Sequence, residues 1–186
     1  MVATAPTLSE LDDNQLLVLA RAGDARARPA FGQLAKRHQA WLIRLLYYLL
    51  HNQSEAEDVG QETLVRAFTA ISEFRGNSSF RGWLRVIATR LAFNRRRDAR
   101  TRRRYTEELS PVGAPPAGDD LRFEKREAIE ATLKKLPYPY REILVLRYVE
   151  ELSIARIAAL LDLGQSAAKM RLSRAREQFQ AEFAHQ

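Results

Sequence analysis

The chain has 186 residues, a formal net charge of +7 and a pI near 10.0. Its hydrophobic fraction of 46% is sufficient for a packed core, which excludes a wholly disordered chain. The absence of cysteine excludes both a disulfide framework and a thiolate zinc site. The basic balance indicates a polyanionic partner, either nucleic acid or an acidic membrane surface.

The chain shows no targeting or membrane signal. The first ten residues lack a basic start followed by an apolar run, so we expect no secretory signal. The most apolar stretch, Trp41 to Leu50, contains Arg44 and is too short to cross a bilayer. We therefore expect a soluble, cytoplasmic protein without direct membrane insertion.

Helical patterns cover the first half of the chain. Asp12 or Asp13 can cap a helix to Ala22, and Pro29 suits the first turn of a longer helix that reaches Tyr48. A third helix is predicted from a capping box at Ser54 and Glu57 to about Phe74. After the loop at 75–78, Ser79 can cap a fourth helix. Its expected buried seam is Phe80, Leu84, Ile87 and Leu91.

A linker is predicted where proline and glycine are concentrated. Residues 110–118 contain three prolines and two glycines, a composition that no helix or interior strand tolerates. We expect an all-α protein with two helical domains joined by a flexible linker. The predicted parts are a flexible N-terminus (1–10), an N-terminal domain (11–105), an acidic linker (106–120) and a C-terminal domain (121–186).

The C-terminal domain carries a helix-turn-helix pattern. Helices are predicted at 121–135, 140–149, 153–161 and 165–183. Ala158 is small enough for close crossing, Asp162 lies in the turn, and Ala168 and Leu172 face inward. The outward side of the last helix carries four bases and no acid between Gln165 and Arg176, as a DNA recognition helix requires. The alternative is an ordinary helical hairpin.

Charge is sorted by segment. The stretch from Arg75 to Arg104 has eleven arginines and one acid, Asp98. The neighbouring helix, 54–74, has five acids and one base, whereas residues 105–120 have four acids and no base. Blocks of one sign indicate separate partners. The arginines can pair with phosphates, and Phe80 or Trp83 could stack on an unpaired base, although core packing is the favoured alternative for Trp83.

No constellation for catalysis is present. His38, His51 and His185 do not have a metal-binding spacing, and there is no glycine-rich phosphate loop. We therefore predict a non-enzymatic protein with no catalytic residue, no metal and no cofactor. The two competing hypotheses are an autonomous helix-turn-helix regulator, which leaves the acidic helix unexplained, and a nuclease, which lacks a carboxylate or histidine cluster in the basic segment.

Two stretches resemble the two domains of extracytoplasmic-function (ECF) sigma factors of the sigma-70 family. The first is AEDVGQETLVRAF, at 56–68, with FRGNSSFRGWLRVIATRLAFNRRRD, at 74–98. The second is LPYPYREILVLRYVEELSIARIAALLDLGQSAAKMRLSRARE, at 136–177. Their order and the linker between them make the resemblance much more specific than either stretch alone.

The resemblance implies a sigma factor that binds the RNA polymerase core, recognises −10 and −35 promoter elements and promotes DNA melting. The implied contacts with the largest and second-largest polymerase subunits are Glu57, Asp58, Gln61, Glu62, Leu136, Tyr140 and Ile143. The implied −10 contacts are Arg75, Asn77, Ser78, Ser79, Phe80, Arg81, Trp83, Arg85, Arg90, Asn94, Arg95, Arg96 and Arg97. The implied −35 contacts are Gln165, Ser166, Lys169, Met170, Arg171, Ser173, Arg174 and Arg176. It further implies regulation by stress or envelope signals and an anti-sigma partner, which can be membrane-anchored.

The sequence departs from the family pattern at the recognition helix. Ser166 and Ala167 stand where the family usually has glycine and threonine, and Asp162 stands where it often has glycine. Loss of the threonine hydroxyl would change the −35 preference. The fold is not threatened, because aspartate tolerates turn conformations.

Overall fold

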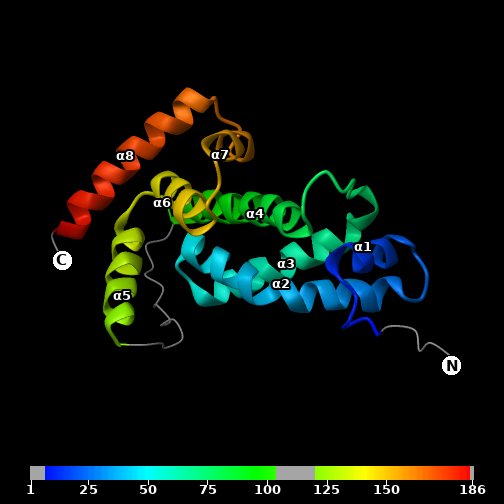
Figure 1. Cartoon of the computed structure of the whole chain (residues 1–186). Coiled ribbons are helices and arrows are strands. Elements are labelled where there is room, and N and C mark those ends of the chain that lie inside the picture. Colours follow the sequence, from blue (N-terminus) through cyan, green and yellow to red (C-terminus); the bar gives the residue numbers. More distant parts are fainter. Residues whose placement is uncertain (1–6, 104–119, 185–186) are drawn as a thin grey trace. The chain divides into compact units, whose positions relative to one another are not determined.

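The computed structural model describes residues 7–103 and 120–184, with side chains at 7–97 and 127–184. Regular structure in these ranges is helical throughout (Figure 1), which confirms the predicted fold class. The helices are α1 (Asp13–Arg21), α2 (Ala27–Leu50), α3 (Gln53–Thr69), α4 (Phe80–Arg103), α5 (Asp120–Lys135), α6 (Tyr138–Leu144), α7 (Ile154–Leu160) and α8 (Gln165–Ala184). A 3-10 turn, η1 (Ile71–Glu73), follows α3, and a π-helical turn, η2 (Val145–Val149), follows α6.

The described residues form two compact units. The first contains α1, most of α2, α3 and α4, and the second contains α5 to α8 together with Tyr47–Gln53. The grouping of Tyr47–Gln53 with the second unit differs from the predicted limits of the N-terminal domain. The proline-rich segment 110–118 lies outside the described residues, so the linker stays a prediction.

The first helix begins as the sequence predicts. The side chain of Asp12 accepts a hydrogen bond from the Gln15 amide at 2.8 Å, and the Gln15 side chain accepts one from the Asp12 amide at 2.9 Å. This reciprocal capping box satisfies two amides that the helix itself leaves without acceptors. Leu16, Leu17 and Ala20 then turn one face of α1 into the core.

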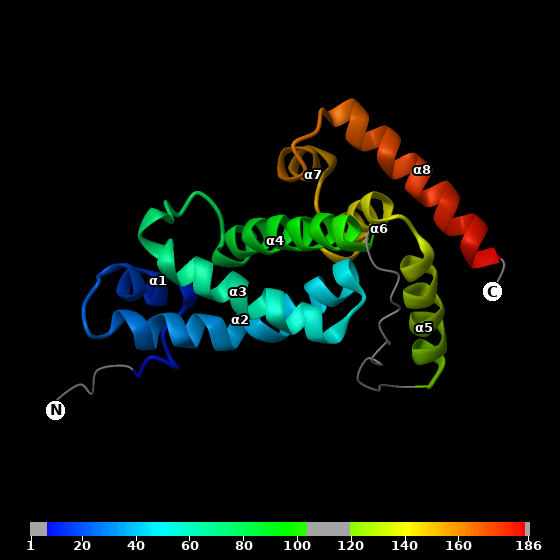
Figure 2. The ribbon, with the colours of Figure 1, turned by 180° about the vertical axis from the view of Figure 1, so that it is seen from behind.

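Helices α2 and α3 lie alongside each other in the first unit (Figures 1 and 2). A Cβ at Gly60 of α3 would collide with Cδ1 of Ile43 on α2, so the absence of a side chain permits this approach. The core between them is rich in leucine, including Leu42, Leu45 and Leu46. The predicted start of α3 is wrong: the helix begins at Gln53, which places Ser54 inside the first turn.

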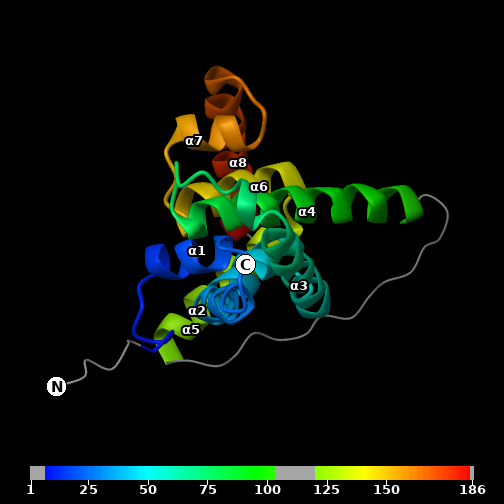
Figure 3. The ribbon, with the colours of Figure 1, turned by 90° about the vertical axis from the view of Figure 1, so that its right-hand side faces the viewer.

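The arginine-rich helix α4 begins at the predicted cap. The Ser79 side chain accepts a hydrogen bond from the Gly82 amide at 3.1 Å. Phe80, Leu84 and Leu91 are buried, and Ile87 is half-buried, so the predicted seam anchors the helix. Figure 3 shows the C-terminal half of α4 extending beyond the rest of the first unit.

In the second unit, the buried guanidinium of Arg141 closes the end of α5. It donates hydrogen bonds to the carbonyls of Leu133 (2.8 Å), Lys134 (2.8 Å) and Leu136 (3.1 Å). These carbonyls lie in the last turn of α5 or just after it, where the helix offers few amides; the Leu133 carbonyl also accepts from the backbone amide of Leu136 at 3.2 Å. A buried cation is thus matched by acceptors, and the junction between α5 and α6 is rigid.

The helix-turn-helix consists of α7 and α8, with α7 lying across the beginning of α8 (Figure 1). Ser153 caps α7 by accepting from the Arg156 amide at 3.3 Å. Asp162 adopts φ 53°, so the aspartate itself supplies the left-handed turn that favours glycine. Ala158, Ala168 and Leu172 are buried, as predicted.

Within the described ranges, none of the helices combines the length and apolar character needed to cross a membrane.

Glu142 couples the stability of the second unit to pH. The side chain is 3% exposed, and the Tyr138 hydroxyl donates to its Oε1 at 3.2 Å. Burial raises the pKa of this carboxyl to about 7, against smaller opposing effects of the Tyr138 hydrogen bond and the charge of Arg171. The folded state therefore binds more protons than the unfolded state between pH 4.5 and about 7, and the free energy of unfolding falls as pH rises through this window.

We expect Glu142→Gln to remove this pH dependence while keeping an acceptor for Tyr138. The advantage of the variant over the parent should grow from pH 5 to 7, by at most about 1.4 kcal/mol per pH unit, and then level off. Hydrogen exchange of α6 and α8 reports the stability of the second unit alone. Tryptophan fluorescence does not, because both tryptophans, Trp41 and Trp83, lie in the first unit. Parallel pH profiles for parent and variant would contradict the expectation.

Candidate nucleic-acid and polymerase interfaces

The loop before α4 presents a continuous exposed surface. All five residues from Arg75 to Ser79 are exposed. Gly76 adopts φ 74°, which turns the chain sharply where a side chain would be strained. Asn77 and Ser78 lie at the surface beside this turn, whereas Ser79 caps α4. The loop therefore offers an amide and a hydroxyl to a partner, with Ser79 holding the helix end.

Phe80 does not belong to that surface. Its side chain is 2% exposed, and its ring lies 5.3 Å from His38 and 6.1 Å from Phe31. The prediction that Phe80 contacts a flipped base is wrong, because the helical seam draws the ring into the core. Trp83 is half-buried, with its ring 5.2 Å from Phe74 and 6.1 Å from Phe80. It therefore packs in the core and still shows part of its surface.

The α4 arginines whose side chains the structure describes, at 81–97, are exposed or half-buried. Arg81, Arg90 and Arg97 are exposed, as is Asn94, and Arg85, Arg95 and Arg96 are half-buried. Arg81 and Arg85 both approach the ring of Trp41 on α2, with guanidinium carbons 4.5 and 5.8 Å from the ring centroid. The side chains of the further arginines at 100–104 lie outside the described ranges.

The acidic helix α3 points three of its four predicted contact residues into solvent. Glu57, Asp58 and Gln61 are exposed. Glu62 is instead paired with Arg66 at 2.7 Å and with Arg95 of α4 at 3.5 Å. Glu62 is therefore neutralised locally and links α3 to the arginine-rich helix α4.

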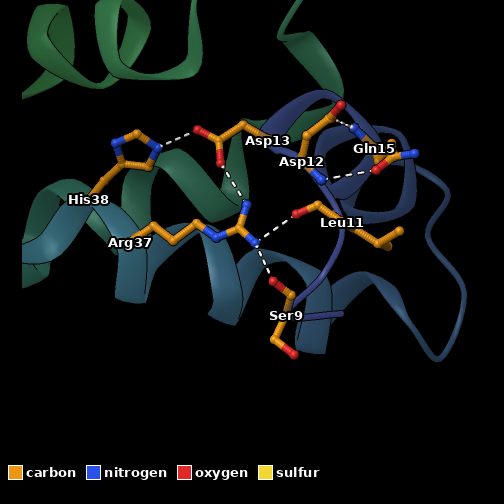
Figure 4. A network of polar contacts seen from close by, with 7 residues as sticks. All are labelled: Ser9, Leu11, Asp12, Asp13, Gln15, Arg37 and His38. Carbon is orange, nitrogen blue, oxygen red and sulfur yellow. Dashed lines mark hydrogen bonds and ion pairs between the residues drawn. The ribbon is translucent and has the colours of Figure 1, made fainter. Parts of the chain in front are cut away.

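Helix α1 is fastened to α2 by a polar network that the sequence did not reveal (Figure 4). Asp13 accepts from Arg37 at 3.0 Å and lies 2.7 Å from Nε2 of His38. Arg37 also donates to the carbonyls of Ser9 and Leu11, at 2.8 and 2.6 Å. These contacts join residues about 25 positions apart, so no local pattern indicates them.

The ionised form of Asp13 is favoured in this network. Partial burial raises the pKa of the carboxyl, but the hydrogen bonds and charges of His38 and Arg37 together outweigh it and lower the pKa below its usual value. The stabilisation is therefore present above the unfolded-state pKa and is lost as pH falls through the folded-state value. Arg37 and His38 lie about one turn of α2 before Trp41. The network therefore also fixes the surroundings of the Trp41 ring, which faces two arginines of α4.

The recognition helix α8 presents the predicted set of side chains. Gln165, Ser166, Lys169 and Met170 are exposed, as are Ser173, Arg174 and Arg176; Arg171 is half-buried. Ser173 donates to Glu177 at 3.1 Å. The exposed residues begin at the first turn of α8, the end that a recognition helix inserts into the major groove.

Tyr148 holds one of these cations. Nε of Arg176 donates to the Tyr148 hydroxyl at 2.5 Å, and the guanidinium carbon lies 5.5 Å from the Tyr148 ring centroid. Tyr148 is 54% exposed and is carried by the π-helical turn η2. The α-helical period of the sequence does not indicate Tyr148, because the extra residue of a π turn shifts the exposed positions out of that period.

Two of the hydrophobic residues assigned to polymerase contact belong to the core. Leu136 is 2% exposed and Ile143 is 0% exposed, whereas Tyr140 is half-buried. Their side chains cannot reach a partner while the unit stays folded, so the assignment of direct contacts to Leu136 and Ile143 is corrected. Tyr140 remains available for the predicted contact.

In the described ranges, no group of three or more histidine, aspartate or glutamate side chains could hold a metal ion. The arrangement thus consists of three charged surfaces on a helical scaffold: the loop 75–79 with α4, the exposed acids of α3, and the outward side of α8.

Comparison with known proteins agrees with this division. Residues 34–102 match the family described as sigma-70 region 2, and residues 126–179 match sigma-70 region 4. The chain is 31% identical over 160 residues to the ECF RNA polymerase sigma factor SigW of Bacillus subtilis, covering 80% of this chain and 86% of SigW.

Two solved structures have the same fold. CnrH, in complex with the cytosolic domain of CnrY, is 30% identical with a TM-score of 0.62, over 91% of this chain and 95% of CnrH. The sigma factor RpoE from Bartonella quintana, in complex with the anti-sigma factor NepR, has a TM-score of 0.66 at 23% identity, over 83% of this chain and 96% of RpoE. The two matched regions and the relationship to SigW place the chain among the ECF sigma factors of the sigma-70 family, which initiate transcription with bacterial RNA polymerase.

Proposed function

We propose that this sigma factor docks on core polymerase through the exposed acids of α3, reads the −35 element with α8, and opens the −10 element with the loop 75–79 and α4. The observation that carries the proposal is the placement of an exposed polar loop directly before an arginine-lined helix, in the same unit as an acidic helix. Arginine side chains bind phosphates without regard to sequence, whereas exposed amides and hydroxyls can contact bases.

The steps divide between the surfaces. The acidic face of α3 complements a basic polymerase surface and brings the factor to the enzyme. Moving a base out of the stack costs roughly a few kcal/mol of stacking and pairing free energy. Contacts with Asn77 and Ser78 would offset this cost while α4 holds the strand. Because Phe80 is buried, its role is to fix the start of α4.

We also propose an anti-sigma partner that keeps the factor from polymerase until a stress or envelope signal arrives. The complex of RpoE with NepR supports the kind of partner.

The first prediction concerns polymerase docking. Asp58→Lys should weaken association with core polymerase at least about tenfold, because charge reversal at a complementary surface replaces attraction by repulsion. The matched control is Glu73→Lys, the same reversal at an exposed acid after α3. Fluorescence anisotropy with core polymerase gives both dissociation constants. Equal values for the two variants would contradict docking through α3.

The second prediction concerns the −35 element. Lys169→Ala and Arg174→Ala should each make the plot of log binding constant against log salt concentration less steep for −35 DNA. The slope should change by roughly one unit, which is the value for one phosphate contact. Substitutions at Gln165 or Ser166 should instead change which bases are preferred. Lys135→Ala removes an exposed cation at the end of α5 and should change neither property. Selection from a randomised promoter library by the holoenzyme measures the base preferences. If all four variants lowered the binding of every promoter sequence by the same factor, base readout by α8 would be excluded.

The third prediction concerns strand opening. Asn77→Ala combined with Ser78→Ala should leave closed complexes nearly normal and slow opening, with rescue on a template whose −10 region is already unpaired. Both residues are exposed, so the variant should keep the thermal stability of the parent. Phe80→Ala serves as the contrast, because truncation of a buried phenylalanine costs about 3–5 kcal/mol. Permanganate footprinting reports opening, and parental opening on duplex DNA by the double variant would reject base capture.

A further inference from the structure

The ring of Trp41 has two guanidinium groups against it. Trp41 lies on α2, and the guanidinium carbons of Arg81 and Arg85 on α4 are 4.5 and 5.8 Å from its centroid. The two arginines are four positions apart, so they occupy the same side of α4 one turn from each other. Both distances fall within the range in which an aromatic ring attracts a cation.

The position of Trp41 is determined by three helices. Its ring meets that of His38 edge-on, with centroids 6.5 Å apart and an interplanar angle of 85°. His38 is in turn held by Asp13 of α1 at 2.7 Å and packs against Phe80 in the first turn of α4, at 5.3 Å. The ring is 8% exposed, so it cannot itself stack on a nucleic-acid base.

A guanidinium that lies over a ring has restricted rotamers and still directs its N–H groups outward around the edge of the plane. Phosphate binding then loses less side-chain freedom than it would with an unrestrained arginine. Placement at a shared ring therefore prepares both arginines for a phosphate backbone.

We propose that Trp41 is a positioning residue, which holds Arg81 and Arg85 in the conformation that binds backbone phosphates of the −10 strand. The proposal rests on the proposed function for its ligand and adds a residue from α2, outside the predicted −10 set. Trp41 acts through the two arginines and makes no contact with DNA.

The test is a double-mutant cycle on the full chain, with fluorescent oligo(dT) as a phosphate-backbone probe over a salt series. Trp41→Leu should weaken binding about three- to tenfold, in keeping with the strength of cation–π contacts, and Trp41→Phe should retain part of the affinity because a ring remains. In an Arg81→Ala/Arg85→Ala background, Trp41→Leu should have no further effect. An equal loss in both backgrounds, or parental binding by folded Trp41→Leu, would overturn the proposal.

Two further variants separate positioning from packing. Val59→Ala truncates another fully buried side chain of the first unit, on α3. It should lower thermal stability while leaving the salt dependence of oligo(dT) binding unchanged; a loss of affinity equal to that of Trp41→Leu would count against the proposal. If Trp41→Leu does not fold, Arg81→Lys/Arg85→Lys keeps both charges without planar stacking and should reproduce the weakened binding; parental affinity would refute it.

Oligo(dT) binding needs neither polymerase nor promoter, so it is independent of the proposed function. If the parent failed to initiate transcription with core polymerase, the proposed function would be rejected. The coupling of Trp41 to the arginines could still be measured with oligo(dT). With an active holoenzyme, Trp41→Leu should also slow promoter opening, and parental opening would show that the arginine pair does not act on the −10 strand.

Discussion

The burial of Phe80 is the contact on which the proposed −10 surface of the first unit depends. Its ring packs against Phe31 and His38 and so fixes the first turn of α4 against α2. Residues 75–79, directly before it, form an exposed loop, and the arginines described after it, at 81–97, are exposed or half-buried. A helix with so many cations of one sign repels itself, so an apolar seam is needed to hold it on the protein. The chemistry of the surface follows from that attachment.

The charged side chains of the first unit divide into those that pair within the unit and those that are exposed to partners. Glu62 joins α3 to Arg66 and to Arg95 of α4, so one acid of the docking helix stabilises the scaffold. Asp58, one helical turn earlier, is exposed. Arg81 and Arg85 lie against a ring, which attracts a cation without neutralising its charge. The unit can therefore be stable as it stands and still present both an acidic and a basic surface.

The second unit solves a different problem, which is to hold a recognition helix rigidly on a small core. Arg141 closes the end of α5 with three backbone carbonyls, and Asp162 supplies the left-handed turn between α7 and α8. The π turn η2 places Tyr148 beside Arg176. These features direct the outward side of α8 to solvent, where base edges and phosphates can be contacted.

The sequence by itself determined the helical class, the capped starts of α1 and α4, the seam of α4 and the outward side of α8, because these follow from local periodicity and capping. It also placed the charged blocks, since charge is a property of composition. Only the tertiary structure decided that Phe80, Leu136 and Ile143 are core residues and that Glu62 is paired. It likewise brought Asp13 to His38 and Trp41 to the arginines, because those contacts join distant helices. Burial and pairing depend on which helices meet, and no single segment contains that information.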